Sequence, residues 1–162
     1  LGPPGMHVLP EKDFIISVGN NKTRERITEL FQLQYAKALI HPKATLSTRV
    51  QIDECTVLMG HAIINTGTRI GKHVIINTSA SVDHDCIIHD FAHISPNAIL
   101  SGGVTVGRGT HIGSGAVIIP NLKIGDYVTI GAGAIIIRDV EDNAVVVGNP
   151  GRVIRHGDKP RF

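Results

Sequence analysis

Nine histidines are the side chains of this sequence best suited to acid–base chemistry. One of them, His84, stands between two carboxylates in the segment Ser81-Val82-Asp83-His84-Asp85-Cys86. A carboxylate beside an imidazole raises the pKa of the imidazole and holds one tautomer, as a general base requires. The same segment also fits a solvated polar corner with no catalytic role. The spacing alone leaves both interpretations open.

Other reactive motifs are weakly represented. The sequence contains no P-loop and no Gly-x-Gly-x-x-Gly between a strand and a helix. Ser101 and Ser114 lack the setting of a nucleophile elbow. Gly102 and Gly103 predict a turn, although glycine would also let a ligand approach the backbone closely.

These residues are embedded in an internal repeat of six residues. The residue four positions after each repeated aliphatic is small or β-branched in 16 of 17 cases, with Leu122 as the exception. A period of six fits no α-helix, but it fits short strands joined by tight turns. The 17 aliphatic positions are Ile40, Leu46, Ile52, Leu58, Ile64, Ile70, Ile76, Val82, Ile88, Ile94, Leu100, Val106, Ile112, Ile118, Ile124, Ile130 and Ile136.

Three such strands close a triangular coil of 18 residues, and stacked coils form the hexapeptide β-helix. The span 40–141 holds 102 residues and therefore predicts about six coils. We expect a mainly β fold whose core is a stack of aliphatic and small side chains. Cys86 falls on an inward small position, where it fills the core.

The phase of the repeat also places three histidines. His93 and His111 each precede an inward aliphatic and should point outward, stacked one coil apart because 18 residues separate them. His84 falls at a corner. The repeat contains no insertion, so we expect no protruding loop that could form a lid. Any site must be built from turns, from outward strand positions and from neighbouring chains.

The N-terminal residues do not follow the repeat. Residues 1–11 are predicted to be loop, and residues 13–19 to be a buried strand. Residues 22–33 are predicted to form an amphipathic helix with its apolar face at Ile27, Leu30 and Phe31. A strand followed by a helix is typical of α/β domains, but this unit is too small to bury its own core.

The C-terminal residues also leave the repeat, which gives boundaries at 1–36, 37–141 and 142–162. A buried strand is predicted over 144–148 and a turn at Asn149-Pro150-Gly151. A basic tail should follow, with charges at Arg152, Arg155, Lys159 and Arg161.

Composition excludes several classes. The 162 residues carry a net charge of +2 with scattered Lys and Arg, so we expect neither a nucleic-acid partner nor an anionic membrane. No apolar run approaches the roughly 18 residues that span a bilayer. Cys55 and Cys86 form no Cys-x-x-Cys pair, so we expect reduced thiols and no cysteine zinc site. Residues 1–10 do not resemble a signal peptide, which favours the cytoplasm.

Several segments together resemble a family of bacterial acyltransferases, the UDP-4-amino-sugar N-acetyltransferases with the related sialic acid O-acetyltransferases. Besides the hexads, they are SVDHDCIIHDFAHISPNAILSGGVTVG (81–107), IPNLKIGDYVTIGAGA (119–134) and GNPGRVIR (148–155). FIISVGNNKTRERI (14–27) resembles the end of that family's N-terminal domain, which binds the nucleotide sugar. Residues 1–36 would then be the C-terminal part of such a domain.

The resemblance implies a left-handed β-helix that assembles as a homotrimer, uses acetyl-CoA and has its sites between subunits. It implies that His84 is the general base that takes a proton from the sugar amine, and that Asp85 tunes this histidine. Asn77 would be a polar residue near the base, on the substrate side. Neither a metal nor a covalent enzyme intermediate is required.

The resemblance also implies four positions that contact acetyl-CoA. His93 would lie near the thioester, and the backbone at Gly102 near the reacting acyl group. Ser114 and Ala132 would lie where the coil backbone meets the pantetheine arm.

Three alternatives remain beside transfer to an amine. The acceptor could be a hydroxyl of sialic acid or another sugar. A γ-type carbonic anhydrase has the same fold, and His84 and His89 reproduce its His-x4-His spacing, but its third ligand would fall near Thr48. A non-catalytic β-helix scaffold would explain neither the His-Asp turn nor the C-terminal segment.

Overall fold

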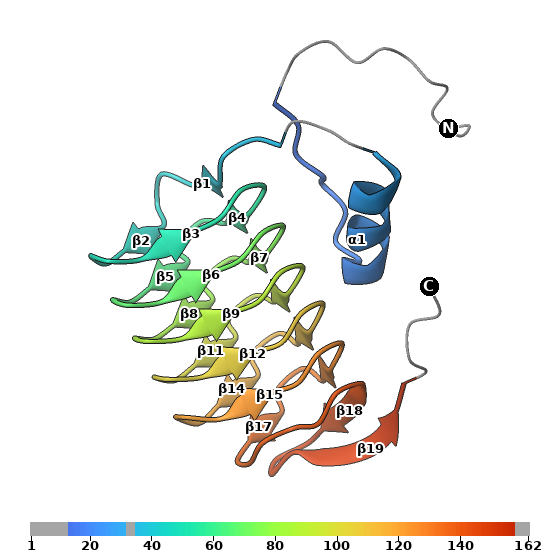
Figure 1. Cartoon of the computed structure of the whole chain (residues 1–162). Helices are drawn as coiled ribbons and strands as arrows, with labels where there is room; N and C mark the ends of the chain where they lie inside the picture. Colours follow the sequence, from blue (N-terminus) through green and yellow to red (C-terminus); the bar gives the residue numbers. More distant parts are fainter. Residues whose placement is uncertain (1–12, 32–34, 158–162) are drawn as a thin grey trace.

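The computed structural model describes residues 13–31 and 35–157, and most of them form a three-sided parallel β-helix (Figure 1). Seventeen strands of two residues each, β1 to β17, follow one another from Leu39 to Ile136. Each of these strands ends on one of the aliphatic residues that define the sequence repeat. The predicted β-helix of about six coils is therefore confirmed.

The strands form three parallel sheets, one on each side of the coil. The eight-stranded sheet holds β1 (Leu39–Ile40), β4 (Val57–Leu58), β7 (Ile75–Ile76), β10 (His93–Ile94), β13 (His111–Ile112), β16 (Thr129–Ile130), β18 (Ala144–Val147) and β19 (Arg152–His156). The six-stranded sheet holds β2 (Thr45–Leu46), β5 (Ile63–Ile64), β8 (Ser81–Val82), β11 (Ile99–Leu100), β14 (Val117–Ile118) and β17 (Ile135–Ile136). The five-stranded sheet holds β3 (Gln51–Ile52), β6 (Arg69–Ile70), β9 (Ile87–Ile88), β12 (Thr105–Val106) and β15 (Lys123–Ile124).

The chain turns a corner between successive strands. We call the corner that leads from the eight- to the six-stranded sheet the first corner, that from the six- to the five-stranded sheet the second, and that from the five- back to the eight-stranded sheet the third. From 49 to 133, one residue at each corner has a positive φ. Because equivalent residues are 18 apart, side chains at one corner stack along the axis.

The core is the stack of inward aliphatic and small side chains predicted from the repeat. The aliphatics from Leu58 to Ile136 are at most 2% exposed, and Cys86 is fully buried among them. Three inward small positions are buried threonines, Thr56, Thr68 and Thr110. Both cysteines are free.

The first coil is less buried than the repeat predicts. Ile40 is 46% exposed and Leu46 37% exposed, whereas the same position in the next coil, Leu58, is 1% exposed. A coil inside the stack has neighbours above and below, but no further coil stacks above β1 to β3. The expectation that all 17 aliphatics are core residues is therefore wrong for this end of the prism.

The N-terminal segment differs from its prediction. Residues 13–19 form no extended strand, and only one parallel bridge joins Phe14 to Tyr35. Helix α1 (Asn21–Leu30) begins after Asn20, whose side chain caps Thr23 N at 2.9 Å. The helix ends at Leu30, three residues before the predicted end at Leu33, and Leu33 itself lies outside the described residues.

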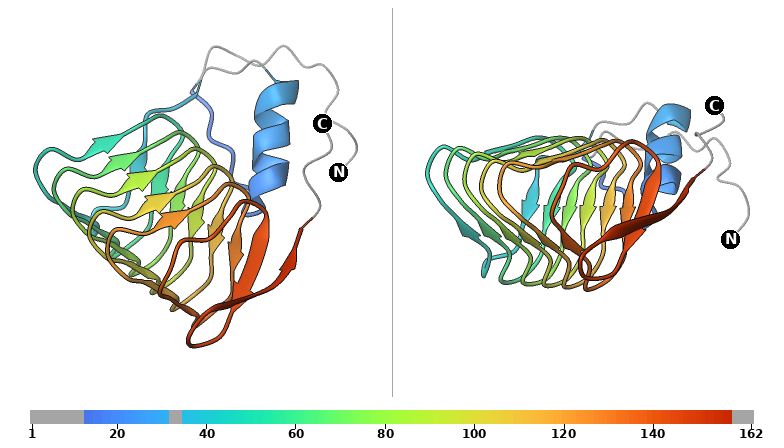
Figure 2. Two further views of the ribbon diagram at one scale, coloured as in Figure 1. Left: turned by 60° about the horizontal axis from the view of Figure 1, so that its bottom comes forward. Right: turned by 90° about the horizontal axis from the view of Figure 1, so that it is seen from below.

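The buried face of α1 is polar rather than apolar. Leu30 is 64% exposed and Ile27 is only partly buried, so the predicted apolar face is wrong. The helix lies beside the third corner and the eight-stranded sheet (Figure 2). Since the backbone of each corner offers carbonyl groups to the helix, polar side chains make this contact. The buried residues of α1 are Asn21, Arg24 and Glu25.

Arg24 is the centre of this contact. Its guanidinium donates to His73 O and Phe91 O, both at 2.8 Å, and to Val18 O at 2.8 Å. Burial lowers its pKa to about 10. Arg24 thus ties the segment before α1 to two successive coils.

Glu25 completes the contact on the next coils. It accepts from Arg108 Nε at 2.7 Å and from the Tyr127 hydroxyl at 3.1 Å. Arg108 also bonds to Asp90 at 3.0 Å and lies over the ring of Phe91, 4.6 Å from its centroid. Three residues within the first five of α1, Asn21, Arg24 and Glu25, therefore reach four coils.

The C-terminal residues close the last coil. The predicted strand at 144–148 is confirmed as β18, and the turn at Asn149-Pro150-Gly151 leads into β19, which runs antiparallel to β18. Arg152 and Arg155 therefore belong to a strand and not to a tail, while Lys159 and Arg161 lie outside the described residues. In the part of the chain that the structure describes, no helix combines the length and apolar character needed to cross a membrane.

Candidate active site

His84 and Asp85 project from the second corner that follows β8. His84 Nδ1 lies 2.9 Å from Asp85 Oδ2, and both side chains are more than half exposed. The positive φ of Asp85, 56°, turns its carboxylate back toward the neighbouring imidazole. Gly67 lies directly behind Asp85, where a Cβ would collide with the carboxylate. The dyad that the sequence suggested is therefore present.

The electrostatics of this corner favour a protonatable imidazole. The hydrogen bond to Asp85 raises the pKa of His84, and the charge of Asp83 adds to the effect. Because a carboxylate only accepts, Nδ1 of His84 carries a hydrogen and Nε2 carries the lone pair. Nε2 is thus the atom that could take a proton from a substrate.

Gly102 lies under His84, one coil further along the second corner. A Cβ on Gly102 would lie 2.5 Å from His84 Nε2. The absence of a side chain lets the imidazole ring lie directly against the backbone of this glycine. Of the predicted residues, His84, Asp85 and Gly102 therefore form one cluster.

Asn77 and His93 form a second cluster, at the first corner and the adjoining strand β10. Asn77 Oδ1 accepts from Thr78 N at 2.8 Å, so its amide nitrogen faces His93 Nε2 at 3.1 Å. Nε2 of His93 must then accept, which places the hydrogen on Nδ1. The tautomer of His93 is therefore the same as that of His84, but its acceptor nitrogen is already occupied.

The stacking predicted for His93 and His111 is confirmed. The two residues are in register on β10 and β13, with ring centroids 5.0 Å apart. They point outward, as expected, but are largely covered. Burial lowers the pKa of His93 to about 4 and also lowers that of His111, and Arg24 adds to both effects. His93 is therefore neutral at pH 7.

Ser114 and Ala132 lie at the first corner, one and two coils beyond the coil of His93. Both are exposed. The residues after them, Gly115 and Gly133, are also exposed, so this part of the corner presents backbone and small side chains.

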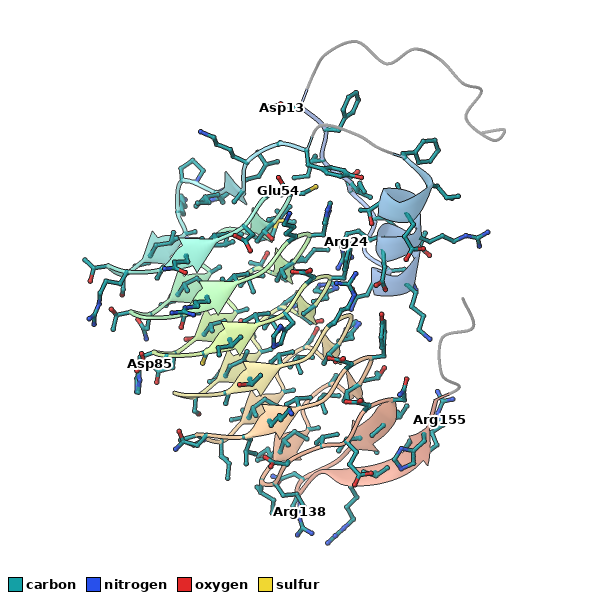
Figure 3. All side chains as sticks on the ribbon, in the orientation of Figure 1. Asp13, Arg24, Glu54, Asp85, Arg138 and Arg155 are labelled. Atoms are coloured by element: carbon teal, nitrogen blue, oxygen red, sulfur yellow. The ribbon has the colours of Figure 1, made fainter. Side chains whose placement is uncertain are left out.

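The two clusters do not meet in one chain. His84, Asp85 and Gly102 lie at the second corner, which faces away from the eight-stranded sheet of a triangular coil. His93 lies on that opposite sheet, and Asn77, Ser114 and Ala132 lie at the first corner, across the six-stranded sheet from the second. In Figure 3, Asp85 lies on one side of the prism and Arg24, whose charge acts on His93, lies at the helix on the other side.

The carbonic anhydrase alternative gains no support. Within residues 13–31 and 35–157, no group of three His, Cys, Asp or Glu side chains could hold a metal ion. His84 and His89 lie at different corners of one coil, the second and the third.

Sequence reasoning missed the contacts that support these clusters. Asn65 and Thr68 bond to the corner that carries His84, and the charge of Arg24 acts on His93. A signal was available for Thr68, because a hydroxyl at an inward small position of the repeat needs a hydrogen-bond partner. No comparable signal marked Asn65 or Arg24.

Comparison with known proteins supports this assignment of the repeat. Residues 85–120 and 103–138 match the family model described as bacterial transferase hexapeptide (six repeats). The structure is similar to the acetyltransferase domain of PglB from Neisseria gonorrhoeae FA1090, also solved in complex with acetyl coenzyme A. The identity is 42%, the TM-score is 0.85, and the match covers 88% of this chain and 70% of that one.

Two further structures are similar. A variant of perosamine N-acetyltransferase from Caulobacter crescentus, in complex with CoA and GDP-perosamine, is 34% identical with a TM-score of 0.83, over 89% of this chain and 69% of that one. WeeI from Acinetobacter baumannii AYE is 29% identical with a TM-score of 0.84, over 94% of this chain and 73% of that one. With this fold, these repeats and this identity, the chain belongs to the hexapeptide-repeat acetyltransferase family.

Proposed function

We propose that this protein transfers the acetyl group of acetyl-CoA to the 4-amino group of a UDP-linked 4-amino-4,6-dideoxy sugar in bacterial glycan biosynthesis. The observation that carries the proposal is the His84–Asp85 dyad. Nδ1 of His84 bonds to Asp85, and Nε2, which lies over Gly102, is left to accept a proton. The relatives solved with acetyl-CoA, and with CoA and GDP-perosamine, support both the donor and the kind of acceptor.

In this mechanism His84 is the general base. The amine nitrogen attacks the carbonyl carbon of the thioester, and His84 Nε2 takes the proton that the nitrogen loses. Asp85, 2.9 Å from Nδ1, stabilises the imidazolium that forms. His84 then returns the proton to the departing sulfur as the carbon–sulfur bond breaks. The acetyl-CoA thioester supplies the activated acyl group, so no covalent enzyme intermediate is needed.

The acetyl-CoA side of the site would be the first corner. His93, held by Asn77, would lie near the thioester, and the pantetheine arm would pass Ser114 and Ala132. A neutral His93 suits this place, because a charged imidazolium beside the base would disfavour protonation of His84.

A complete site therefore requires two copies of the chain, and three copies in a ring would give three equivalent sites. The second corner of one copy would face the first corner and eight-stranded sheet of the next. Ile63 and Ile99, on the outer side of the six-stranded sheet, are 42% and 45% exposed, and a trimer contact would cover such side chains.

We further propose a cytoplasmic location, where acetyl-CoA is available.

We propose that residues 1–36 are the C-terminal part of a domain that binds the nucleotide sugar, which is the acceptor.

The test of the function is release of free thiol from acetyl-CoA with a panel of acceptors. UDP- and GDP-linked 4-amino sugars and free sialic acid are the informative members. Turnover with the 4-amino sugars is expected, and turnover with sialic acid alone would overturn N-acetylation in favour of O-acetylation.

A further inference from the structure

The corner that carries His84 and Asp85 is held from inside by a buried threonine of the preceding coil. The hydroxyl of Thr68 donates to Asp83 O at 2.7 Å and accepts from Cys86 N at 3.1 Å. Asp83 and Cys86 are the first and last residues of the four-residue corner 83–86. Thr68 is fully buried, so water cannot replace either hydrogen bond.

The same corner is held from outside by Asp83. Its Oδ1 accepts from His84 N at 2.8 Å and from Asn65 Nδ2 at 2.9 Å. Asn65 occupies the equivalent position one coil earlier, and its own Oδ1 lies 3.4 Å from the Ser47 hydroxyl of the coil before that. Asp83 therefore links the backbone of His84 to a polar ladder along the second corner.

We propose that Thr68 and the Asn65–Asp83 pair are positioning residues that set the location of His84 Nε2. The proposal rests on the acetyl transfer proposed above. The imidazole is more than half exposed, and among the residues that the structure describes its only side-chain hydrogen bond is to Asp85, which belongs to the same four-residue corner. The backbone of that corner therefore determines where the basic nitrogen lies. A displacement of about 1 Å at a reacting group can lower a rate on the order of 100-fold.

The chain contains the same threonine clamp in places that carry no candidate base. Thr110 donates to Gly125 O at 2.7 Å and accepts from Val128 N at 3.0 Å, and it is equally buried. Thr56 makes the same pair of bonds to Gly71 O and Val74 N. Both of these clamps act on the third corner. Of these three, Thr68 alone holds the second corner.

Asp83 has an electrostatic effect in addition to its geometry. Two carboxylates face His84 from its own corner, Asp83 and Asp85, and both raise its pKa. The preceding coils contribute Asn65 and Thr66, with the guanidinium of Arg49 against the Thr66 hydroxyl at 3.4 Å. The following coil contributes Ser101 and Gly102, neither of which is charged.

The deciding experiment compares Thr68→Val with Thr110→Val in the full chain, with wild type alongside. Each substitution removes one hydroxyl and two hydrogen bonds at a matched site, so both variants should lose a similar amount of thermal stability. Thr68→Val should lower kcat about tenfold or more with little change in KM for acetyl-CoA, while Thr110→Val should stay within about twofold of wild type. Thr68→Ser, which keeps the hydroxyl, should recover the loss.

Equal kcat values for the two valine variants would overturn the inference. A wild-type chain with no turnover on any acceptor would instead overturn the proposed function. If Thr68→Val does not fold, Asp83→Asn gives a second test, because the amide keeps an acceptor oxygen but loses the charge. Loss of the Asp83 charge should lower the pKa of His84, so the acid limb of the pH profile of kcat/KM should move to lower pH in this variant. An acid limb at the wild-type position would contradict the role of Asp83.

Discussion

His84 Nε2 lies directly over Gly102, so closely that a Cβ on the glycine would be 2.5 Å from the nitrogen. The two residues are 18 apart and therefore occupy the same corner of successive coils. One repeat of the coil thus supplies both the basic nitrogen and the glycine that lets the imidazole lie there.

Gly102→Ala should consequently disable the site without unfolding the protein. The added methyl group would displace the imidazole from its place, so we expect kcat to fall about 100-fold with an unchanged melting temperature. Gly60→Ala is the control, because its Cβ would meet His41 at an ordinary 3.4 Å. Similar activity of the two variants would show that acetyl transfer does not depend on the imidazole lying against Gly102.

His84→Ala should abolish acetyl transfer but not donor binding. Removal of a general base typically costs a factor of about 1,000 in rate. Binding of acetyl-CoA, measured by calorimetry, should persist because the first corner is intact. Near-wild-type turnover in this variant would contradict the assignment of His84 as the general base.

The pH dependence of kcat/KM should report the imidazole of His84. Asp85 and Asp83 raise its pKa, and the base acts in its neutral form, so the acid limb should lie above the ordinary histidine value of about 6.5. Asp85→Asn removes the larger cause and should move this limb to lower pH. Because the acceptor amine is the same in both measurements, the difference between the profiles isolates the histidine.

Mixing two inactive variants should restore activity if the site spans two copies. In His84→Ala chains the first corner is intact, and in His93→Ala chains the second corner is intact. In a ring of randomly mixed chains, an interface is intact only when one chain supplies His84 and its neighbour supplies His93. Each condition is met by half of the chains, so roughly one quarter of the interfaces should be intact. Activity is measured after joint refolding, at low acetyl-CoA. A mixture no better than the mean of its parents would indicate that each chain forms its own site.

Arg24 should control the titration of the covered histidines. Burial is the larger cause of the low pKa of His93, and the Arg24 charge contributes. Arg24→Ala removes that charge and the three hydrogen bonds that join the segment before α1 to the third corner, so the pKa of His93 should rise from about 4. NMR titration of the imidazoles measures this directly. The pKa of His84, which Arg24 does not affect, serves as the internal control.

Core substitutions should distinguish the middle of the prism from its first coil. Leu100→Ala, in a fully buried position, should lower the free energy of unfolding by about 3 kcal/mol. Ile40→Ala, at a position 46% exposed, should cost about 1 kcal/mol. Chemical denaturation of both variants provides the comparison, and equal losses would mean that the first coil is covered in solution.

The repeat was sufficient to predict the β-helix, because a strict period of six has one regular solution in which every aliphatic is inward. It also placed His84 at a corner and stacked His93 on His111, since a period of 18 relates equivalent positions. The ends could not be read in this way. The polar side chains of α1 are buried by carbonyl groups of the coils, and no local pattern reveals those partners.

What the sequence by itself determined is therefore the coil and the phase of each residue on it. Only the tertiary structure showed that Thr68 and Asn65 hold the corner of His84, because hydrogen bonds between coils depend on side-chain direction as well as on phase. Only it showed that His93 is largely covered while His84 is more than half exposed, although neither is a core position. The physical reason is that α1 and the segment before it contact the coils beside the eight-stranded sheet and not the corner of His84.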